Sequence, residues 1–377
     1  MKSKRYNVTE DRYYEKRKIV GGGVIGLAAV CSLLFTGCGV KDADKGVALE
    51  AQITPIKYNR DAIVTVMSDD GIYETGVMLD ELGDKHNIKI TVSGIVSYVE
   101  PHLKEWKKLE RKGNLELISH SYTHLKMSED AGISVSDLEH EITDSIQFYK
   151  KHFKTDQVAF TPPENQMCGQ GYEILADNDI RAMRQGGRGY NTIEPQRGYE
   201  AAQWYNLYTF GIGDVSTTEE RNAWIDGAVQ NHAWLIEMWH DVTENGDHGL
   251  YQEIAYADAD AHLSYIADKQ SDGDIWAASM VDAVKYLSEK EYATVSAAYN
   301  GAKITVSLTC DSAELPSDIY NDALTIRVLV PEEADDFTKV ISSDKKNEVR
   351  IFKEEGDTYL EFEMVPNGKD VIIKLQK

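Results

Sequence analysis

The sequence predicts an α/β domain with a parallel sheet, either open or closed into a barrel, followed by a small all-β domain. Two observations carry this prediction. Short β-branched or apolar runs alternate with helical patterns from residue 61 to about residue 292, which is typical of βαβ units. Beyond residue 292 the chain changes to strand-like segments separated by turn signals, most simply a sandwich.

The composition indicates a large globular protein. The chain has 377 residues, of which 42% are hydrophobic, and this length allows two or three domains. Its 40 basic and 63 acidic residues give a net charge of −23, without a concentrated basic patch. A nucleic-acid partner is therefore not expected, because phosphate binding needs such a patch. Beyond the N-terminal segment only Cys168 and Cys310 remain, which predicts neither a disulfide framework nor a zinc-ligand motif.

Residues 1–38 have the pattern of a secretory signal peptide. Basic residues are frequent over 1–18, and an uncharged apolar stretch over 19–37 follows them. The stretch runs into Phe-Thr-Gly-Cys, which resembles the end of a bacterial lipoprotein signal, with Cys38 as the lipidated residue. An uncleaved anchor is the alternative, since about 18 apolar residues just span a bilayer. We therefore expect an exported protein, either a membrane lipoprotein facing outside or a secreted or anchored form, with residues 39–59 as a linker.

The segment 60–292 is predicted as the α/β domain. Its expected strands are the apolar runs at 62–67, 88–92, 115–118, 158–160, 207–210 and 235–238. Apolar residues that recur every three or four positions predict helices, most clearly over 134–152 and 281–292. Ser136 and Glu139 have the spacing of a capping box at the start of the first of these helices.

Residues 293–377 are predicted as a small, sandwich-like β domain and as a candidate carbohydrate-binding domain. Several segments alternate polar and apolar residues, as half-buried strands do. The expected strands lie at 302–308, 324–330, 348–353, 358–364 and 370–375.

Two polar motifs directly follow two of the expected barrel strands. Asp69 and Asp70 come after the strand at 62–67, and His120 and His124 come after the strand at 115–118. The carboxyl ends of parallel strands gather at one edge, where active sites lie. One carboxylate and two imidazoles can bind a divalent cation if the histidine segment turns helically, and they leave positions for water and substrate. The alternatives are a turn or cap for the aspartates and a solvated pair for the histidines.

A third expected strand, at 235–238, leads into His240 at the same edge. A histidine there can protonate a leaving group, although a lone histidine at a strand end is more often structural. Trp239 and His248 are further candidates for substrate contact. The alternative for Trp239 is packing in the core.

These motifs together resemble the polysaccharide deacetylases, the NodB homology domain of carbohydrate esterase family 4, over about residues 60–290. The resemblance implies a deformed barrel of seven or eight strands and one divalent ion, usually zinc. A site with one carboxylate and two imidazoles also accepts cobalt, nickel or manganese. By position, the resemblance implies roles for five residues: Asp70, His120 and His124 as metal ligands, Asp69 as general base and His240 as general acid.

Two features usual in that family are missing from the sequence. The family commonly has an Arg that orients the catalytic Asp, and the matching position after the strand at 158–160 is Thr161. Arg184, which follows a strand-like segment at 180–183, is the candidate substitute. The Asp-Trp motif that commonly supports the catalytic His is not recognisable either.

The sequence thus predicts a monomeric, metal-dependent hydrolase that removes N- or O-linked acetyl groups from a polysaccharide or oligosaccharide outside the cytoplasm. Membrane contact is expected only through the N-terminal lipid or anchor. The missing partners support a second hypothesis, a carbohydrate-binding surface lipoprotein whose catalytic site has decayed. A phosphoesterase is a third, and the lack of a basic clamp near the motifs speaks against it. The acidic charge favours a neutral glycan over an anionic polymer.

Overall fold

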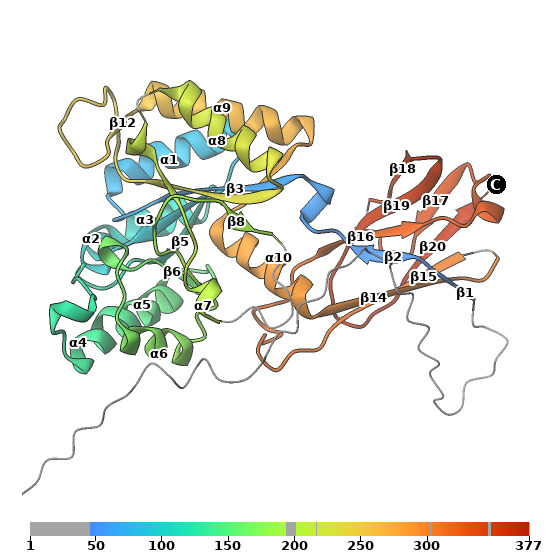
Figure 1. Ribbon diagram of the computed structural model, residues 1–377, viewed down its shortest axis with the longest axis horizontal. Helices are drawn as coiled ribbons and strands as arrows, with labels where there is room; N and C mark the ends of the chain where they lie inside the picture. Colours follow the sequence, from blue (N-terminus) through green and yellow to red (C-terminus); the bar gives the residue numbers. More distant parts are fainter. Residues whose placement is uncertain (1–45, 194–200, 216, 302, 346–347, 377) are drawn as a thin grey trace, which may run out of the picture. The chain divides into compact units, whose positions relative to one another are not determined.

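A computed structural model describes residues 46–193, 201–215, 217–301, 303–345 and 348–376 (Figure 1). The predicted signal peptide, with Cys38, and the first part of the predicted linker lie outside these residues. The chain divides into two units at residue 44, so the α/β and β regions fall within one unit, residues 45–377. Within the described residues no helix combines the length and the hydropathy that a membrane span requires.

A nine-stranded, mostly parallel sheet forms the centre of the α/β region. β10 pairs with one edge of β3, while β13 and β4 pair in succession with the other. The sheet continues from β4 through β5, β6 and β7. The bounds are β3 (Ala62–Ser68), β4 (Ile90–Gly94), β5 (Leu115–Ser119), β6 (Ala159–Phe160), β7 (Ala182–Met183), β10 (Ala233–Trp239) and β13 (Ile275–Ala277).

The chain beyond β7 closes this sheet into a deformed barrel. Arg184 forms a parallel bridge with Leu207, and shortly afterwards β9 (Phe210–Gly211) pairs with β10. Residues 207–211 therefore connect the β7 edge to the β10 edge and act as a seventh barrel strand. β8 (Asn191–Thr192) adds a short antiparallel pair with β10. The predicted deformed (β/α) barrel of seven or eight strands is confirmed.

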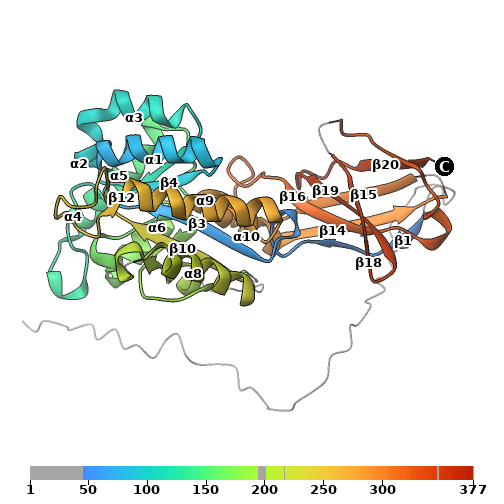
Figure 2. The ribbon, with the colours of Figure 1, turned by 90° about the horizontal axis from the view of Figure 1, so that it is seen from above.

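Every residue of β3, β4, β5 and β10 is buried. Their largely apolar or β-branched sequences suit a parallel sheet that is covered on both faces. Helices cover the outer face, and Figure 2 shows α3, α1, α9 and α8 side by side in this order, with contacts between each neighbouring pair. The helices are α1 (Tyr73–His86), α2 (Val96–Val99), α3 (Leu103–Glu110), α4 (Val135–Glu139), α5 (Ser145–His152), α6 (Gly169–Asp177), α7 (Ala201–Trp204), α8 (Thr218–Gln230), α9 (Tyr256–Asp272) and α10 (Met280–Tyr292).

The helix predicted over 134–152 is present, but its start differs from the prediction. Ser134 is the N-cap, and its side chain accepts a hydrogen bond from the backbone N of Asp137. Ser136 already lies in the first turn of α4, so the predicted capping box at Ser136 is wrong. A π-helical segment, His140–Asp144, joins α4 to α5.

The C-terminal region is all-β, as predicted, and consists of two antiparallel sheets. One has the order β1-β14-β15-β20-β17 and the other β18-β19-β16-β2. Their buried apolar side chains form one cluster, as expected for a sandwich. The strands are β1 (Val47–Leu49), β2 (Ala51–Ile53), β14 (Ala293–Tyr299), β15 (Lys303–Cys310), β16 (Leu324–Leu329), β17 (Lys339–Ser342), β18 (Arg350–Glu354), β19 (Asp357–Met364) and β20 (Val371–Gln376).

The prediction of a linker over residues 39–59 is wrong for its second half. β1 pairs with β14 of one sheet, and β2 pairs with β16 of the other. Both strands have only three residues, which is too short for a period-two pattern to identify them. The β region is thus completed by a segment that precedes the barrel in the sequence.

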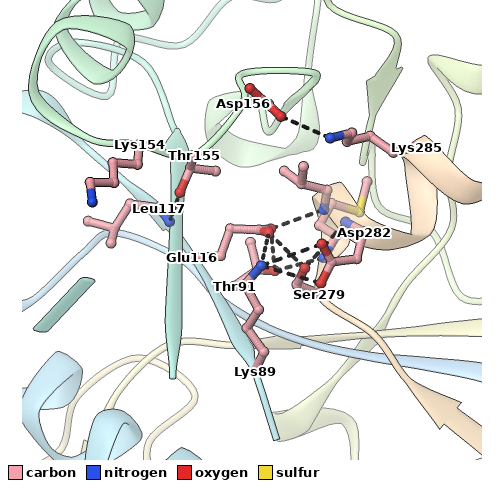
Figure 3. Close-up of polar contacts among 12 residues, drawn as sticks. Lys89, Thr91, Glu116, Leu117, Lys154, Thr155, Asp156, Ser279, Asp282 and Lys285 are labelled. Atoms are coloured by element: carbon pink, nitrogen blue, oxygen red, sulfur yellow. Dashed lines mark hydrogen bonds and ion pairs between the residues drawn. The ribbon is translucent and has the colours of Figure 1, made fainter. Parts of the chain in front are cut away.

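Glu116, on β5, holds the start of α10 against the barrel through a buried carboxylate (Figure 3). Its Oε2 accepts a hydrogen bond from Oγ of Ser279, the N-cap of α10, at 2.7 Å. Its Oε1 accepts from the backbone N of Val281 at 3.0 Å and from Oγ1 of Thr91 at 3.1 Å. Lys89 Nζ lies 3.3 Å from Oε2. This carboxylate therefore satisfies donors from both the sheet and the helix terminus.

We expect Glu116→Ala to lower the free energy of unfolding by about 2–4 kcal/mol, because several buried donors lose their acceptor. Urea denaturation followed by circular dichroism measures this change. Glu81→Ala, at an exposed position of α1, is the control and should stay within about 0.5 kcal/mol of the wild type. Equal losses in the two variants would contradict the role of Glu116.

Candidate metal centre

The polar motifs of β3, β5 and β10 meet at the carboxyl edge of the barrel. Asp69 and Asp70 follow β3, His120 follows β5, and His240 follows β10. The five residues predicted as ligands, base and acid all line one pocket of about 310 Å³. The pocket is lined by Asp69, Asp70, His120, His124, Pro162, Glu164, Asn165, Met238, His240 and Tyr251.

Asp70, His120 and His124 present one ligand atom each to a common point. These three atoms lie within 4.8 Å of one another. Asp70 Oδ1 is 3.6 Å from Nε2 of His120 and 3.8 Å from Nε2 of His124. These distances are too long for hydrogen bonds, but they are close to the separation of two ligands that each lie about 2.0–2.2 Å from one ion.

The surroundings of His120 fit a metal ligand. Its Nδ1 lies 2.8 Å from the carbonyl oxygen of Thr161 and donates its proton there, which leaves Nε2 as the free acceptor facing Asp70. Burial lowers the pKa of His120, although Asp69 and Asp70 oppose this effect. The ring is therefore neutral at neutral pH, which is the form that binds metals.

The loop that carries the two histidines is turned but not helical, so the expected helical turn is wrong. Ser121 has a φ of 74° and His124 a φ of 68°, both in the left-handed region. The Oγ of Ser121 accepts a hydrogen bond from the backbone N of His124 at 3.0 Å. The carboxylate of Glu141 accepts from the backbone N of Tyr122 and of Thr123. These contacts bring the two imidazoles together, with ring centroids 5.1 Å apart.

Residues with left-handed backbone conformation gather at the site, which indicates that the fold imposes its geometry. Asp70 has a φ of 71°, in addition to the two loop residues of the histidine segment. Each such conformation in a non-glycine residue costs roughly 1–3 kcal/mol and persists only where the surroundings impose it. The backbone N of Ile95 donates to the carbonyl of Asp70 at 3.0 Å, which holds this turn to the start of α2.

Asp69 is 4% exposed, and both oxygens of its carboxylate have partners. Ser93 Oγ donates to Oδ1 at 2.6 Å, and Arg184 Nη2 donates to Oδ2 at 2.5 Å. Burial by itself favours the neutral acid, but the guanidinium of Arg184 and the rings of His120 and His240 hold the pKa of Asp69 below its ordinary value. Asp69 is therefore a carboxylate at neutral pH, and its orientation is set from two sides.

Arg184 reaches Asp69 from the strand next to the one that carries Thr161. It follows β7 and is fully buried, and its backbone N donates to the carbonyl of Phe160 at 3.2 Å. Its second contact is to Asn165, whose Oδ1 accepts from Nη1 at 3.1 Å. Arg184, the substitute predicted from the sequence, therefore contacts Asp69, the candidate base. Thr161 contacts His120 instead, with 3.0 Å between its Oγ1 and the ring Nδ1.

The sequence predicted no role for Asn165 and Ser93, which orient Arg184 and Asp69 respectively. Asn165 has a φ of 56°, which asparagine tolerates better than most residues. A Cβ at Gly186 would lie 2.5 Å from its Cγ, so this glycine permits the close approach. The Gly186-Gly187 pair was a usable signal for such an approach. No comparable signal marks Ser93.

His240 lines the same pocket and lacks the support that the resemblance implies. Its Nδ1 is buried and has no hydrogen-bond partner within the part of the chain that the structure describes. The backbone is held by Ser68, whose Oγ donates to the His240 carbonyl at 2.9 Å. The ring of Tyr251 packs edge-on against the imidazole, with 4.7 Å between the ring centroids.

Trp239 and His248, the two remaining candidates, do not line the pocket. Successive residues of a strand point to opposite faces, so Met238 faces the pocket while Trp239 is buried on the helix side. The Trp239 Nε1 donates to Glu237 at 3.1 Å. His248 is half exposed and contacts Glu253, 2.9 Å from its Nδ1. The predicted substrate contact of Trp239 is therefore wrong, and its alternative, packing in the core, holds. Substrate contact by the exposed His248 stays a prediction.

The fold and the pocket define a barrel protein with a candidate centre for a single divalent ion, next to a carboxylate and a histidine. Residues 57–183 match the model of the polysaccharide deacetylase family. This segment includes Asp69, Asp70, His120 and His124, and the match confirms the resemblance drawn from these motifs. No curated protein sequence matches the chain.

Solved structures with a similar chain path share little sequence with this protein. One is the Xyl-CE4 domain of a multidomain xylanase from the hindgut metagenome of Trinervitermes trinervoides, at 18% identity and a TM-score of 0.41, covering 59% of this chain and 89% of that chain. A family 4 carbohydrate esterase from Streptomyces lividans, in complex with acetate, has 13% identity, a TM-score of 0.40 and coverage of 59% and 94%. A CE4 family pseudoenzyme from Bacillus anthracis has 14% identity and a TM-score of 0.40, covering 58% of this chain and 63% of that chain.

Proposed function

We propose that the protein is a metal-dependent hydrolase that removes N- or O-linked acetyl groups from a polysaccharide or oligosaccharide. One observation carries this proposal: three ligand atoms, a buried carboxylate and a histidine line a single pocket. The match to the polysaccharide deacetylase family supports the class of substrate.

Asp70, His120 and His124 would hold the ion, and this donor set suits zinc, cobalt, nickel or manganese. When bound, a divalent ion lowers the pKa of water and polarises an acetyl carbonyl. His120 has the neutral form that binds a metal, and its Nδ1 donates to the carbonyl oxygen of Thr161. All three ligand residues line the pocket, which leaves room for the acetyl group next to the ion.

Asp69 is the proposed general base. A carboxylate with a low pKa is available to accept the proton of an attacking water. Ser93 and Arg184 each occupy one oxygen, so the carboxylate cannot rotate away from the pocket. Arg184 has the role of a positioning residue, since its guanidinium touches Asp69 and Asn165 but does not line the pocket.

His240 is the proposed general acid. It lines the same pocket as the other candidate residues, where it can donate a proton to the departing sugar oxygen or amine. Its buried Nδ1 has no partner within the described residues, so the tautomer of the ring is not set by a neighbour. This same observation favours the second candidate function, a carbohydrate-binding protein with a decayed catalytic site.

The site of action is proposed to be outside the cytoplasm. The proposal rests on the basic and apolar pattern of residues 1–38, with lipidation at Cys38 or an uncleaved N-terminal anchor as the two modes of attachment. We propose that the protein acts as a monomer, with an acetylated carbohydrate as its only partner besides the membrane.

Acetate release with and without a chelator tests the function. The substrates are acetylated xylan, N-acetylated chitin oligomers and peptidoglycan, and we expect release from at least one of them. Dipicolinate should reduce the rate to background, and added zinc should restore it, because the three ligands leave the pocket open to solvent exchange. Metal bound without acetate release from any substrate would favour the decayed binding protein. Release that persists without metal would refute metal dependence.

A further inference from the structure

The exposed aromatic ring of Tyr251 forms part of the pocket lining. Tyr251 lies in the loop between β11 (Val242–Thr243) and β12 (Ile254–Ala255), a short parallel pair that directly follows β10. It is 67% exposed, lines the pocket and packs against the ring of His240. The ring therefore leaves an accessible aromatic surface at the pocket that carries the candidate metal ligands.

The loop holds this ring in place through Glu253. The Glu253 carboxylate accepts hydrogen bonds from Oγ1 of Thr243 and from the backbone N of His248 and of Leu250. The side chain of His248 also contacts it, with 2.9 Å between Nδ1 and Oε1. These bonds, and the one from Thr243 above all, lower the pKa of Glu253 to about 2. The loop is therefore organised around the carboxylate of Glu253, two residues after Tyr251.

Gln252 also fixes the path of the loop. Its φ is 45°, a left-handed conformation that costs energy in a residue with a side chain. Its side chain packs where Gly213 has no Cβ: a Cβ there would lie 2.8 Å from Cγ of Gln252. Tyr251 thus directly precedes two residues that are held in place, although its own ring is open to solvent.

We infer that Tyr251 is a substrate-binding residue that stacks on the pyranose ring carrying the acetyl group to be removed. An exposed aromatic side chain on a rigid support offers an apolar face to the C–H groups of a sugar at low entropic cost. Its contact with His240 places that sugar next to the proposed general acid. This inference rests on the proposed function, because it assigns the binding face of the same pocket.

The test compares Tyr251→Ala, Tyr251→Phe and a matched control, Leu250→Ala. Leu250 is the neighbouring exposed residue of the same loop and does not line the pocket. Each variant is assayed in full-length protein with N-acetylchitopentaose, acetylated xylopentaose and 4-methylumbelliferyl acetate, an ester without a sugar. The readout is the ratio of kcat/KM for the better oligosaccharide to kcat/KM for the small ester.

We expect Tyr251→Ala to lower this ratio about 3- to 10-fold, mainly through a higher KM for the oligosaccharide. Tyr251→Phe retains the ring face and should keep the ratio within about twofold, as should Leu250→Ala. An unchanged ratio in Tyr251→Ala would overturn the inference. An equal fall in Leu250→Ala would also overturn it, because the cause would then be disturbance of the loop.

Calorimetric titration with the same oligosaccharides separates this inference from the proposed function. If the wild type releases no acetate but binds an oligosaccharide, and only Tyr251→Ala weakens binding, the stacking role stands and the enzymatic proposal fails. If acetate is released and all variants bind with equal affinity, the enzymatic proposal stands and the stacking role is refuted.

Discussion

Asp69→Asn is expected to lower kcat for acetate release by roughly 10²–10⁴-fold while metal affinity is retained. The amide has nearly the shape of the carboxylate and still accepts a hydrogen bond from Arg184 or Ser93, but it cannot take a proton from water. Asp69 is not among the three clustered ligands, so their geometry should persist. Steady-state acetate release, together with zinc titration of the metal-free protein, measures both quantities.

His120→Ala is the control for this experiment. It removes one of three ligands and the anchor on Thr161, so metal binding and activity should be lost together. Activity of Asp69→Asn equal to that of the wild type would refute the assignment of the base. Loss of metal binding in Asp69→Asn would show instead that Asp69 belongs to the ligand set.

The second large effect is expected for Arg184→Met. This change removes the buried guanidinium and leaves the carboxylate of Asp69 buried without its charged partner, so we expect a loss of about 3–5 kcal/mol in the free energy of unfolding. Activity at neutral pH should fall as well. Burial, no longer opposed by Arg184, then raises the pKa of Asp69, and the carboxylate also loses the contact that aims it.

Thermal unfolding and kcat measure these two consequences. Asn165→Ala is the matched comparison, because it removes only the hydrogen bond on the far side of Arg184 and retains the ion pair. Its cost should be about 1–2 kcal/mol, with a smaller loss of kcat. If Arg184→Met and the wild type have the same kcat at equal folded fraction, the positioning role of Arg184 is wrong.

The elements that the sequence predicted well are the ones with a long local pattern. β3 and β10 are seven-residue strands of mostly apolar residues, and strands of a covered parallel sheet are typically rich in such residues. β1 and β2 have three residues each, and no periodicity can develop over that length. Their place depends on the partners that they meet after folding.

The residues of the candidate site also fall into a group that the sequence predicts and a group that it does not. Asp69, Asp70, His120 and His240 were predictable because each directly follows a strand, and parallel strands end at a common edge. Trp239 was misassigned because one residue of shift along a strand reverses the face, and the register of β10 is set by its neighbours. Tyr251 could not be found, since the loop that carries it is shaped by Glu253 and Gln252.

From the sequence alone follow the fold class, the order of its regions and the types of side chain at three strand ends, since these depend on residues that are adjacent in the chain. Only the tertiary structure decided that Arg184, and not residue 161, meets Asp69. The reason is the closure of the barrel, in which β7 pairs with β6 on one side and the segment at Leu207 pairs with Arg184 on the other. Contacts across that closure join residues far apart in the chain, and no local pattern encodes them.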